Sequence, residues 1–294
     1  MNRHLSHILP FLLFMVSACT KTIEIDLPQH DSKTVVNCFF QVDSLFSLEV
    51  GKSFSIFDKR PSPIKSAKVE LFTEGQSIDT FYYDGERYRS HIYPEVNKNY
   101  HIEVTTTEGE LASADSYIPN TPILEFISLE DSVYTDEEGL FIAQLKVIIS
   151  DTSYADNFYE LKLLGKSVNF QNDSILLEAY YDLINDQVFK EEELLAYYPE
   201  SLVFSNALFK GEDYAMTVNF RWGSSHDTYD GLIIILRAVT KEYYEYKKSL
   251  TLHIERQSGD IWDGVGAPIE MVSNIDNGYG IFAGYSELIQ IVNK

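Results

Sequence analysis

Two short motifs contain residue types that could bind phosphate or perform catalysis. Gly165-Lys166-Ser167 has the residues that end a phosphate-binding loop, but Glu160 stands where such a loop needs a glycine, and its negative charge would repel phosphate. Ser224, His226 and Asp227 supply the side chains of a hydrolytic triad. A triad, however, assembles across a fold, and the chain has no GxSxG elbow. A polar loop is therefore the favoured interpretation of the second motif.

The histidines and acidic runs lack the spacing of metal ligands. The seven histidines show no HExxH or related motif. The acidic runs 131–138 and 191–193 could attract Ca²⁺, but they lack EF-hand spacing, so solvated acidic loops are favoured. We predict no metal, no cofactor and no catalytic residue. A carboxylate pair for glycoside hydrolysis stays an open alternative, because any two of 45 acidic residues could meet across a cleft.

Cys19 is the residue with the clearest predicted chemistry. Residues 1–7 contain one arginine and no acid, residues 8–16 are apolar apart from one proline, and two small residues precede Cys19. This pattern is typical of a secretory signal peptide, and the apolar run is too short to span a bilayer. Val16-Ser17-Ala18-Cys19 also resembles the lipobox of bacterial lipoproteins. The resemblance implies cleavage between Ala18 and Cys19 and acylation of Cys19, for example with palmitate, and two or more acyl chains anchor a protein stably. A plain signal peptide is the alternative.

The second cysteine, Cys38, is predicted to be inert. It lies in an apolar strand pattern and has no partner if Cys19 is acylated. A free cysteine in such a strand usually behaves as a small hydrophobic residue. The chain has no CxxC motif, so a redox or metal role is disfavoured.

The charge balance excludes whole classes of partner. The 294 residues include 23 Lys plus Arg and 45 Asp plus Glu, for a net charge of −22. A surface this acidic repels nucleic acid and anionic membrane faces. Hydrophobic residues make up 45% of the chain, so a core can form and disorder is not expected.

The first half of the chain predicts a β-sandwich. Runs rich in Val, Ile, Phe, Tyr and Thr recur about every eight to twelve residues, separated by turn residues. Asp84-Gly85 predicts a tight hairpin, because these residues accept positive φ. The runs are 35–42, 45–54, 67–73, 77–83, 87–90, 100–106 and 111–117.

The second half predicts a larger β domain with one short helix. Pro119 and Pro122 favour an extended linker before it. Its strands are expected at 123–133, 140–150, 157–164, 214–222, 231–236 and 285–292, with 231–236 central and buried on both faces. The acid-rich residues 173–213 are interpreted as a surface insertion in which a helix opens at Glu191. Thr240 is the expected N-cap of a helix that runs to about Leu250 and packs its aromatic face on the sheet.

The predicted organisation is therefore all-β, with two β-sandwich-like domains, the first of them prealbumin- or immunoglobulin-like. The predicted limits are a signal peptide at 1–18, a tether at 19–33, the N-terminal sandwich at 34–118, a linker at 119–122 and the C-terminal β domain at 123–294.

Several segments resemble one family. Ser273-Asn274-Ile275-Asp276-Asn277-Gly278-Tyr279-Gly280-Ile281-Phe282 is dense in turn and glycine residues. Together with 19–27, 33–40, 67–72, 236–239 and 242–246, it resembles an uncharacterised family of Bacteroidota lipoproteins, a domain of unknown function. Cys38 departs from the family's usual glycine. The resemblance implies an outer-membrane lipoprotein that is often encoded beside TonB-dependent receptors, and it supplies no catalytic residues.

The sequence thus predicts a binding protein rather than an enzyme. The favoured function is that of a lipid-anchored cell-envelope accessory protein, attached to the outer membrane through Cys19, which assists a TonB-dependent β-barrel transporter in nutrient uptake. The alternatives are a structural or adhesive surface lipoprotein and a carboxylate-based hydrolase. The face of the outer membrane is undecided, because no acidic cluster directly follows Cys19.

Overall fold

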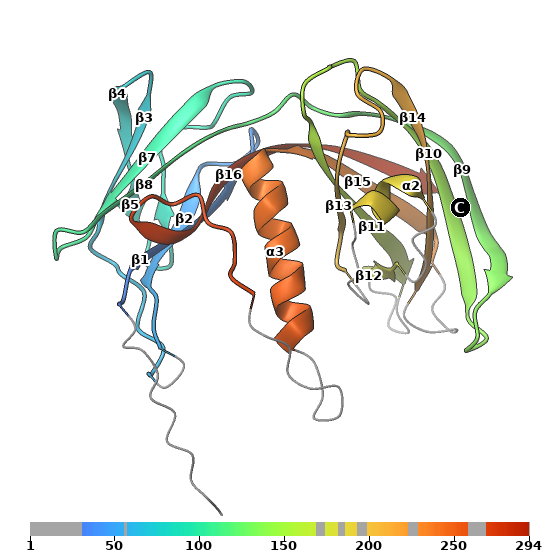
Figure 1. Cartoon of the computed structure of the whole chain (residues 1–294), viewed down its shortest axis with the longest axis horizontal. Coiled ribbons are helices and arrows are strands. Elements are labelled where there is room, and N and C mark those ends of the chain that lie inside the picture. The colour runs from blue at the N-terminus through green and yellow to red at the C-terminus, as the bar shows by residue number, and fades with distance from the viewer. Residues whose placement is uncertain are drawn as a thin grey trace, which may run out of the picture. The chain divides into compact units, whose positions relative to one another are not determined.

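The computed structural model describes residues 31–55, 58–168, 174–181, 186–192, 199–222, 229–257 and 269–293. Within them the chain forms sixteen strands and two helices, which confirms the predicted all-β class (Figure 1). The strands are β1 (Thr34–Phe40), β2 (Ser47–Lys52), β3 (Lys68–Thr73), β4 (Gln76–Thr80), β5 (Tyr82–Tyr83), β6 (Tyr88–Arg89), β7 (Asn99–Thr105), β8 (Leu111–Tyr117), β9 (Ile123–Thr135), β10 (Phe141–Ser150), β11 (Phe158–Val168), β12 (Ser174–Tyr180), β13 (Leu202–Ser205), β14 (Asp213–Trp222), β15 (Gly231–Val239) and β16 (Gly278–Asn293); the helices are α2 (Gln187–Glu191) and α3 (Lys241–Gln257).

The strands form a large sheet and a small one. The 12-stranded sheet has the order β5-β6-β2-β1-β16-β15-β11-β12-β14-β10-β9, with β13 paired to β11, and the 4-stranded sheet has the order β4-β3-β7-β8. The first five strands of the large sheet face the small sheet and enclose a core rich in aromatic rings, in which Phe40, Phe46 and Tyr100 are buried. This is the predicted N-terminal sandwich. The predicted hairpin at Asp84-Gly85 is confirmed, because β5 pairs with β6, but its loop spans residues 84–87, and of the Asp84-Gly85 pair only Gly85 has positive φ.

A strand from the C-terminus completes this sandwich. β16 pairs in parallel with β1, from Thr34 opposite Gly278 to Phe40 opposite Gly284. The sequence predicts a closing strand only from residue 285, whereas the strand begins at residue 278 because the glycine-rich segment is itself extended. Its second half pairs with β15, so β16 contributes to both halves of the large sheet.

The glycines of this segment let β16 approach its neighbours closely. Gly280 has φ +109, and a Cβ atom there would collide with the carbonyl oxygen of Val36. A Cβ on Gly278 would lie 2.7 Å from the Thr34 carbonyl oxygen. The Asn274 side chain forms the two hydrogen bonds that a neighbouring strand's backbone would otherwise form with Phe282. It donates to the Phe282 carbonyl at 2.8 Å and accepts from the Phe282 N–H at 2.9 Å. The motif that carries the family resemblance thus builds the β1–β16 junction.

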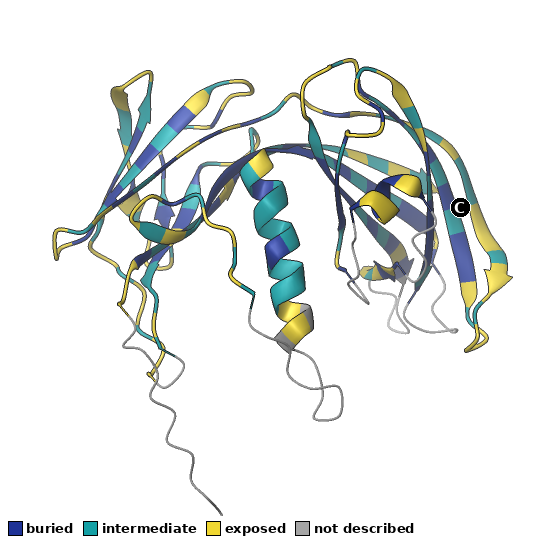
Figure 2. Ribbon diagram, in the orientation of Figure 1, coloured by how far each residue is buried: buried dark blue, intermediate teal, exposed yellow. Residues whose placement is uncertain are grey.

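A second core lies inside the curved C-terminal part of the large sheet (Figures 1 and 2). β15 lies between β16 and β11, which confirms that it is a central strand. Its side chains alternate, however: Leu232, Ile234 and Leu236 are buried in this core, whereas Ile233 and Ile235 are only half-buried on the other face. Burial on both faces was the wrong expectation, because only part of the outer face is covered.

Described residues of the predicted insertion at 173–213 contribute to this core, so the segment does not form only a surface insertion. Val188, Phe189 and Phe204, from α2 and β13, are all buried in it. α2 begins after its N-cap Asp186, which accepts from the Val188 N–H at 3.0 Å, and it ends at Glu191. Residues 193–195 of the helix predicted to open at Glu191 lie outside the described residues.

The predicted helix after Thr240 is confirmed and longer than expected. Thr240 Oγ1 accepts a hydrogen bond from the Tyr243 N–H at 3.4 Å, as an N-cap does. α3 continues to Gln257 and packs on the outer face of the large sheet, where Tyr243 contacts Phe39 with ring centroids 4.9 Å apart. Tyr243 and Ser249 are its buried positions among the described residues, and Figure 2 shows the buried segments of this helix in dark blue.

By their internal contacts, Ser32–Lys294 form one compact unit. The predicted linker at 119–122 lies between β8 and β9, where the chain leaves the small sheet for the large one. The domain limits remain a prediction.

Candidate ligand cavity on the outer sheet face

A cavity of about 980 Å³ lies on the outer face of β1 and β2. Val35 and Asn37 of β1, and Glu49 of β2, alternate with buried core residues, so they face away from the sandwich core and into the cavity. The described residues 53–55 and 58–64 lie over this face; we call them the strap. His253 from α3 and Tyr279 from β16 complete the wall.

The strap is held at both ends by hydrogen bonds. At its start, the Ser53 N–H donates to the Lys33 carbonyl at 2.9 Å, and Ser53 Oγ accepts from the Lys33 N–H at 2.9 Å. At its end, the Ile64 N–H donates to the Val50 carbonyl at 2.9 Å. The buried Tyr88 hydroxyl donates to the Ile64 carbonyl at 3.1 Å. Both anchors are parts of the sandwich, so the cavity has a fixed floor and a tethered roof.

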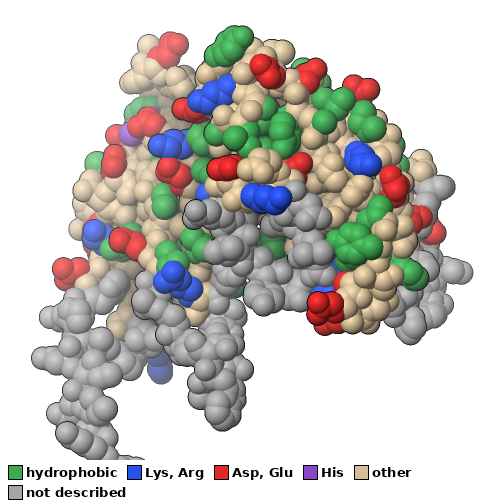
Figure 3. All heavy atoms as spheres, turned by 45° about the vertical axis from the view of Figure 1, so that its right-hand side comes forward, with side chains coloured by type: hydrophobic (Ala, Val, Ile, Leu, Met, Phe, Trp, Pro, Cys, Tyr) green, Lys and Arg blue, Asp and Glu red, His purple; other side chains and the backbone are tan. Residues whose placement is uncertain are grey.

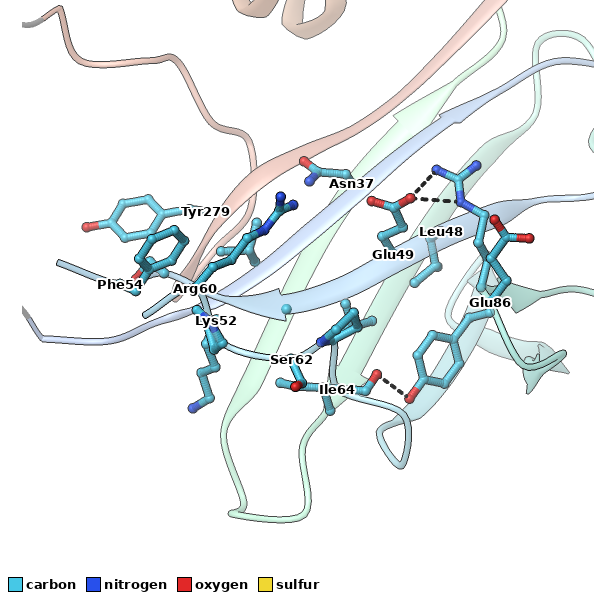
Figure 4. A pocket seen from close by; sticks show the side chains of 18 of the residues that line it. Asn37, Leu48, Glu49, Lys52, Phe54, Arg60, Ser62, Ile64, Glu86 and Tyr279 are labelled. Atoms are coloured by element: carbon cyan, nitrogen blue, oxygen red, sulfur yellow. Dashed lines mark hydrogen bonds and ion pairs between the residues drawn. The ribbon is translucent and has the colours of Figure 1, made fainter. Parts of the chain in front are cut away.

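Two of the three Lys and Arg side chains in the wall are engaged by acids. Lys52 Nζ lies 3.0 Å from Glu108 and 2.5 Å from Glu110, and its hydrogen bond lowers the pKa of Glu110. Arg87 pairs with Glu49 at 2.8 Å. Arg60, on the strap, forms no ion pair or hydrogen bond with any residue that the structure describes. Figure 4 shows its side chain reaching over β2 toward Asn37.

Aromatic rings stand at the same end of the cavity as Arg60. Phe54 and Tyr279 are 44% and 39% exposed. Both are drawn beside Arg60 in Figure 4. The Lys33 ammonium lies 5.0 Å from the centroid of the Tyr279 ring. The end of the cavity near Arg60 thus combines the Arg60 cation with two partly exposed rings, one of which, Tyr279, has the Lys33 ammonium over one face.

Two buried carboxylates position α3, which carries one wall of the cavity. Glu160 on β11 accepts from Arg237 Nη1 at 2.8 Å and from the Tyr243 hydroxyl at 2.6 Å, and Lys247 lies 3.6 Å from it. Burial raises the pKa of Glu160, but the positive charges of Lys247 and Arg237, with the hydrogen bonds from Ser201 and Tyr243, outweigh burial and hold it below its usual value.

The second buried carboxylate, Glu192, contacts Tyr244 and Lys248 of α3. Lys248 Nζ lies 2.8 Å from it, the Tyr244 hydroxyl donates to it, and the Ser205 N–H donates at 2.7 Å. Burial opposes ionisation here too, but Lys248 and these donors lower the pKa of Glu192 below its usual value. Tyr243 and Lys247 thus contact Glu160, and Tyr244 and Lys248 contact Glu192. In each case the lysine follows the tyrosine by four residues, so both lie on the same face of the helix. The contacts of Glu160 and Glu192 therefore stabilise the packing of α3 on the sheet.

Among the described residues, Cys38, Gly165 and Lys166, which the sequence analysis singled out, do not line the cavity. Ala18 and Cys19 lie outside the described residues, as do Ser224, His226 and Asp227. Cys38 is buried in the sandwich core, and burial raises the pKa of its thiol to about 12, which agrees with an inert role. Gly165 and Lys166 lie within β11, and Gly165 packs against the Trp222 ring.

Within the described ranges, no group of three or more His, Cys, Asp or Glu side chains could hold a metal ion. The same ranges contain no helix that is long and apolar enough to cross a membrane.

Sequence reasoning missed Arg60, Asn37 and Tyr279. The one local signal was the break in strand pattern between residues 54 and 67, where Arg60-Pro61-Ser62-Pro63 interrupts the alternation. Such a break predicts a loop, but it does not say which face of the sheet the loop covers.

Fold and site together define an all-β protein with two cores, joined by a shared strand, and a strap-covered cavity. The chain matches the model of the family described as Domain of unknown function (DUF4249) over residues 20–290, and it belongs to that family. No curated protein matches the chain.

Proposed function

We propose that this protein is a lipid-anchored cell-envelope protein that binds a ligand in the strap cavity and assists a TonB-dependent outer-membrane transporter. The cavity carries the proposal. Its volume of about 980 Å³ is in the range of small-molecule sites, about 300 to 1,000 Å³. Its wall mixes apolar rings with polar side chains that have no partner among the described residues, of which Arg60 is the clearest.

The anchor and the partner rest on the sequence. The lipobox-like residues before Cys19 favour a lipid anchor, and the resemblance to Bacteroidota lipoproteins encoded beside TonB-dependent receptors supports a β-barrel partner in the outer membrane. An anchor keeps the binding protein at a high local concentration beside a membrane partner. A captured nutrient then has a short path to the transporter.

An adhesive or structural role is the second candidate. Ile289 and Ile291 of β16 are 55% and 60% exposed and lie opposite the half-buried Ile235 and Ile233 of β15. Exposed apolar groups on a sheet face favour a protein partner. On the face shown in Figure 3, hydrophobic side chains are interspersed with Lys, Arg, Asp and Glu, so charge is mixed there rather than gathered by sign. A hydrolase has less support, because one of the two described acids that line the cavity, Glu49, pairs with Arg87, which leaves Glu86 as the other.

Crosslinked affinity purification from the native envelope tests the transporter role. We expect a TonB-dependent barrel to be recovered with the wild-type chain and lost with Cys19→Ala, which cannot be acylated. Membrane fractionation of both forms serves as the control for the anchor.

The outcomes separate the candidates. Recovery of an envelope or matrix protein instead of a barrel would favour the adhesive role. If the intact, lipidated protein enriches no barrel, the transporter role is wrong.

A further inference from the structure

We propose that the strap cavity binds a small organic carboxylate with an apolar or aromatic body, and that Arg60 holds the carboxylate group. The inference rests on the proposed ligand-binding role of the cavity and names the class of ligand.

The charge of the wall is the first argument. The chain has 45 acidic residues for 23 basic ones, so a basic side chain generally has an acid close by. Lys52 and Arg87 follow this rule, whereas Arg60 has no acidic partner among the described residues. A guanidinium offers parallel N–H donors that match the two oxygens of a carboxylate. Among the described residues, Arg60 is therefore a cation in the cavity wall without an acidic partner, and we expect it to pair with an anion of the ligand.

The neighbours of Arg60 complete a recognition site. The Asn37 carboxamide and the Tyr279 hydroxyl form no hydrogen bond within the described ranges, so they can donate to the same anion or to a polar group beside it. The exposed rings of Phe54 and Tyr279 offer flat apolar faces to the body of the ligand. These groups come from β1, β16 and the strap, and each is placed by an anchored element.

The net charge of the protein favours a ligand with a single negative charge. At −22, the surrounding field disfavours multiply charged anions. Glu86 also lines the cavity and adds a negative charge. One guanidinium can balance one carboxylate, but it cannot balance a phosphate dianion in this setting. Phosphate compounds are accordingly expected to bind more weakly than carboxylates of the same shape.

The test compares three probes with a common ring on the full mature chain. 2-Naphthylacetate carries the carboxylate, 2-naphthylacetamide is its uncharged counterpart, and 2-naphthyl phosphate is the dianionic one. Binding is measured by ligand-observed NMR and by equilibrium dialysis. We expect 2-naphthylacetate to bind most tightly, and Arg60→Gln to weaken it by about ten- to a hundredfold. Arg60→Lys should recover part of the lost affinity, because lysine keeps the positive charge but lacks the paired N–H donors of a guanidinium.

Lys59→Gln is the matched control. Lys59 is an exposed neighbour that does not line the cavity, so its removal alters the net charge equally and should leave binding unchanged. Equal affinities for 2-naphthylacetate and 2-naphthylacetamide would overturn the carboxylate inference but not the ligand-binding role of the cavity. An Arg60→Gln protein that binds 2-naphthylacetate as tightly as wild type would do the same. Tightest binding of the phosphate would also overturn it. If none of the three probes binds, both the carboxylate inference and the ligand-binding role of the cavity are wrong, whereas barrel recovery tests the transporter role separately.

Discussion

Glu160 is a buried carboxylate whose partners lie far away along the chain. It is 2% exposed and receives hydrogen bonds from Arg237, 77 positions later, and from Tyr243, 83 positions later. An ionised carboxylate in this position stabilises the fold only while its cationic partners remain. The group therefore links the sheet to α3, and through α3 to a wall of the cavity.

Glu160→Gln should lower the free energy of unfolding by about 3 kcal/mol at pH 7, because it removes the buried anion that pairs with Lys247 and leaves the half-buried Arg237 with Glu287 as its one remaining carboxylate among the described residues. The pKa of Glu160 is lower in the folded chain, so its stabilisation is present above the unfolded pKa of about 4.3 and is lost as pH falls through the folded pKa. The difference between variant and wild type should shrink below about pH 4. Urea unfolding followed by tryptophan fluorescence at several pH values measures both effects.

Glu245→Gln is the control on the same helix. Glu245 pairs with Lys241 at 3.4 Å on an exposed surface, so the change should cost about 0.5 kcal/mol or less. A Glu160→Gln protein no less stable than this control would show that Glu160 does not hold α3 to the sheet.

At the scale of elements, the junction of β1 and β16 depends on close backbone approach. The pairing is parallel and joins the first and last strands of the fold. Gly280 lies against the Val36 carbonyl and has a backbone conformation that suits glycine. The strap cavity lies beside this junction, because Tyr279 opposite Val35 is part of its wall.

Gly280→Ala should destabilise the protein by about 3 kcal/mol or more, because the added methyl collides with backbone that cannot move aside. Thermal unfolding followed by circular dichroism is the measurement. Gly139→Ala is the matched control: its φ is +83, but an added Cβ meets no atom within 4 Å, so only a backbone cost of about 1 to 2 kcal/mol is expected. Equal losses in the two variants would contradict the close-approach explanation.

At the scale of the whole molecule, β16 makes the N-terminal sandwich dependent on the C-terminus. Ile275 and Phe282, from the segment that leads into β16 and from β16 itself, are buried in the sandwich core. Val292 packs against the second core at the other end of the same strand. One strand thus serves two cores, and removing it would expose β1 as an open edge.

A fragment of residues 31–122 should therefore not fold by itself. We expect no cooperative unfolding transition and a poorly dispersed amide NMR spectrum. The same fragment followed by a Gly-Ser linker and residues 272–286 should regain both, because the linker returns the missing strand to β1. Cooperative folding of the bare fragment would mean that the sandwich does not need β16.

Local patterns in the sequence determined much of the architecture. Alternation along the strands, the hairpin at residues 84–87 and the Thr240 cap each follow from the conformational preferences of a few neighbouring residues, and each is confirmed, although the hairpin loop is longer than the predicted tight turn. The same reasoning supplied the signal and acylation prediction at Cys19, which no structural observation tests. The glycine-rich segment before residue 285 was interpreted as turns, because local preferences alone do not reveal a backbone neighbour that requires glycine.

Only the tertiary structure decided which distant segments meet. The parallel pairing of β1 with β16, the two carboxylates beneath α3, and the strap over Asn37 and Tyr279 join residues separated by most of the chain. Periodicity records whether a side chain faces a core, but it does not record which strand lies beside it. The cavity depends on that second kind of information, so Arg60 became a candidate binding residue only when the strap was seen to cover the outer face of the sheet.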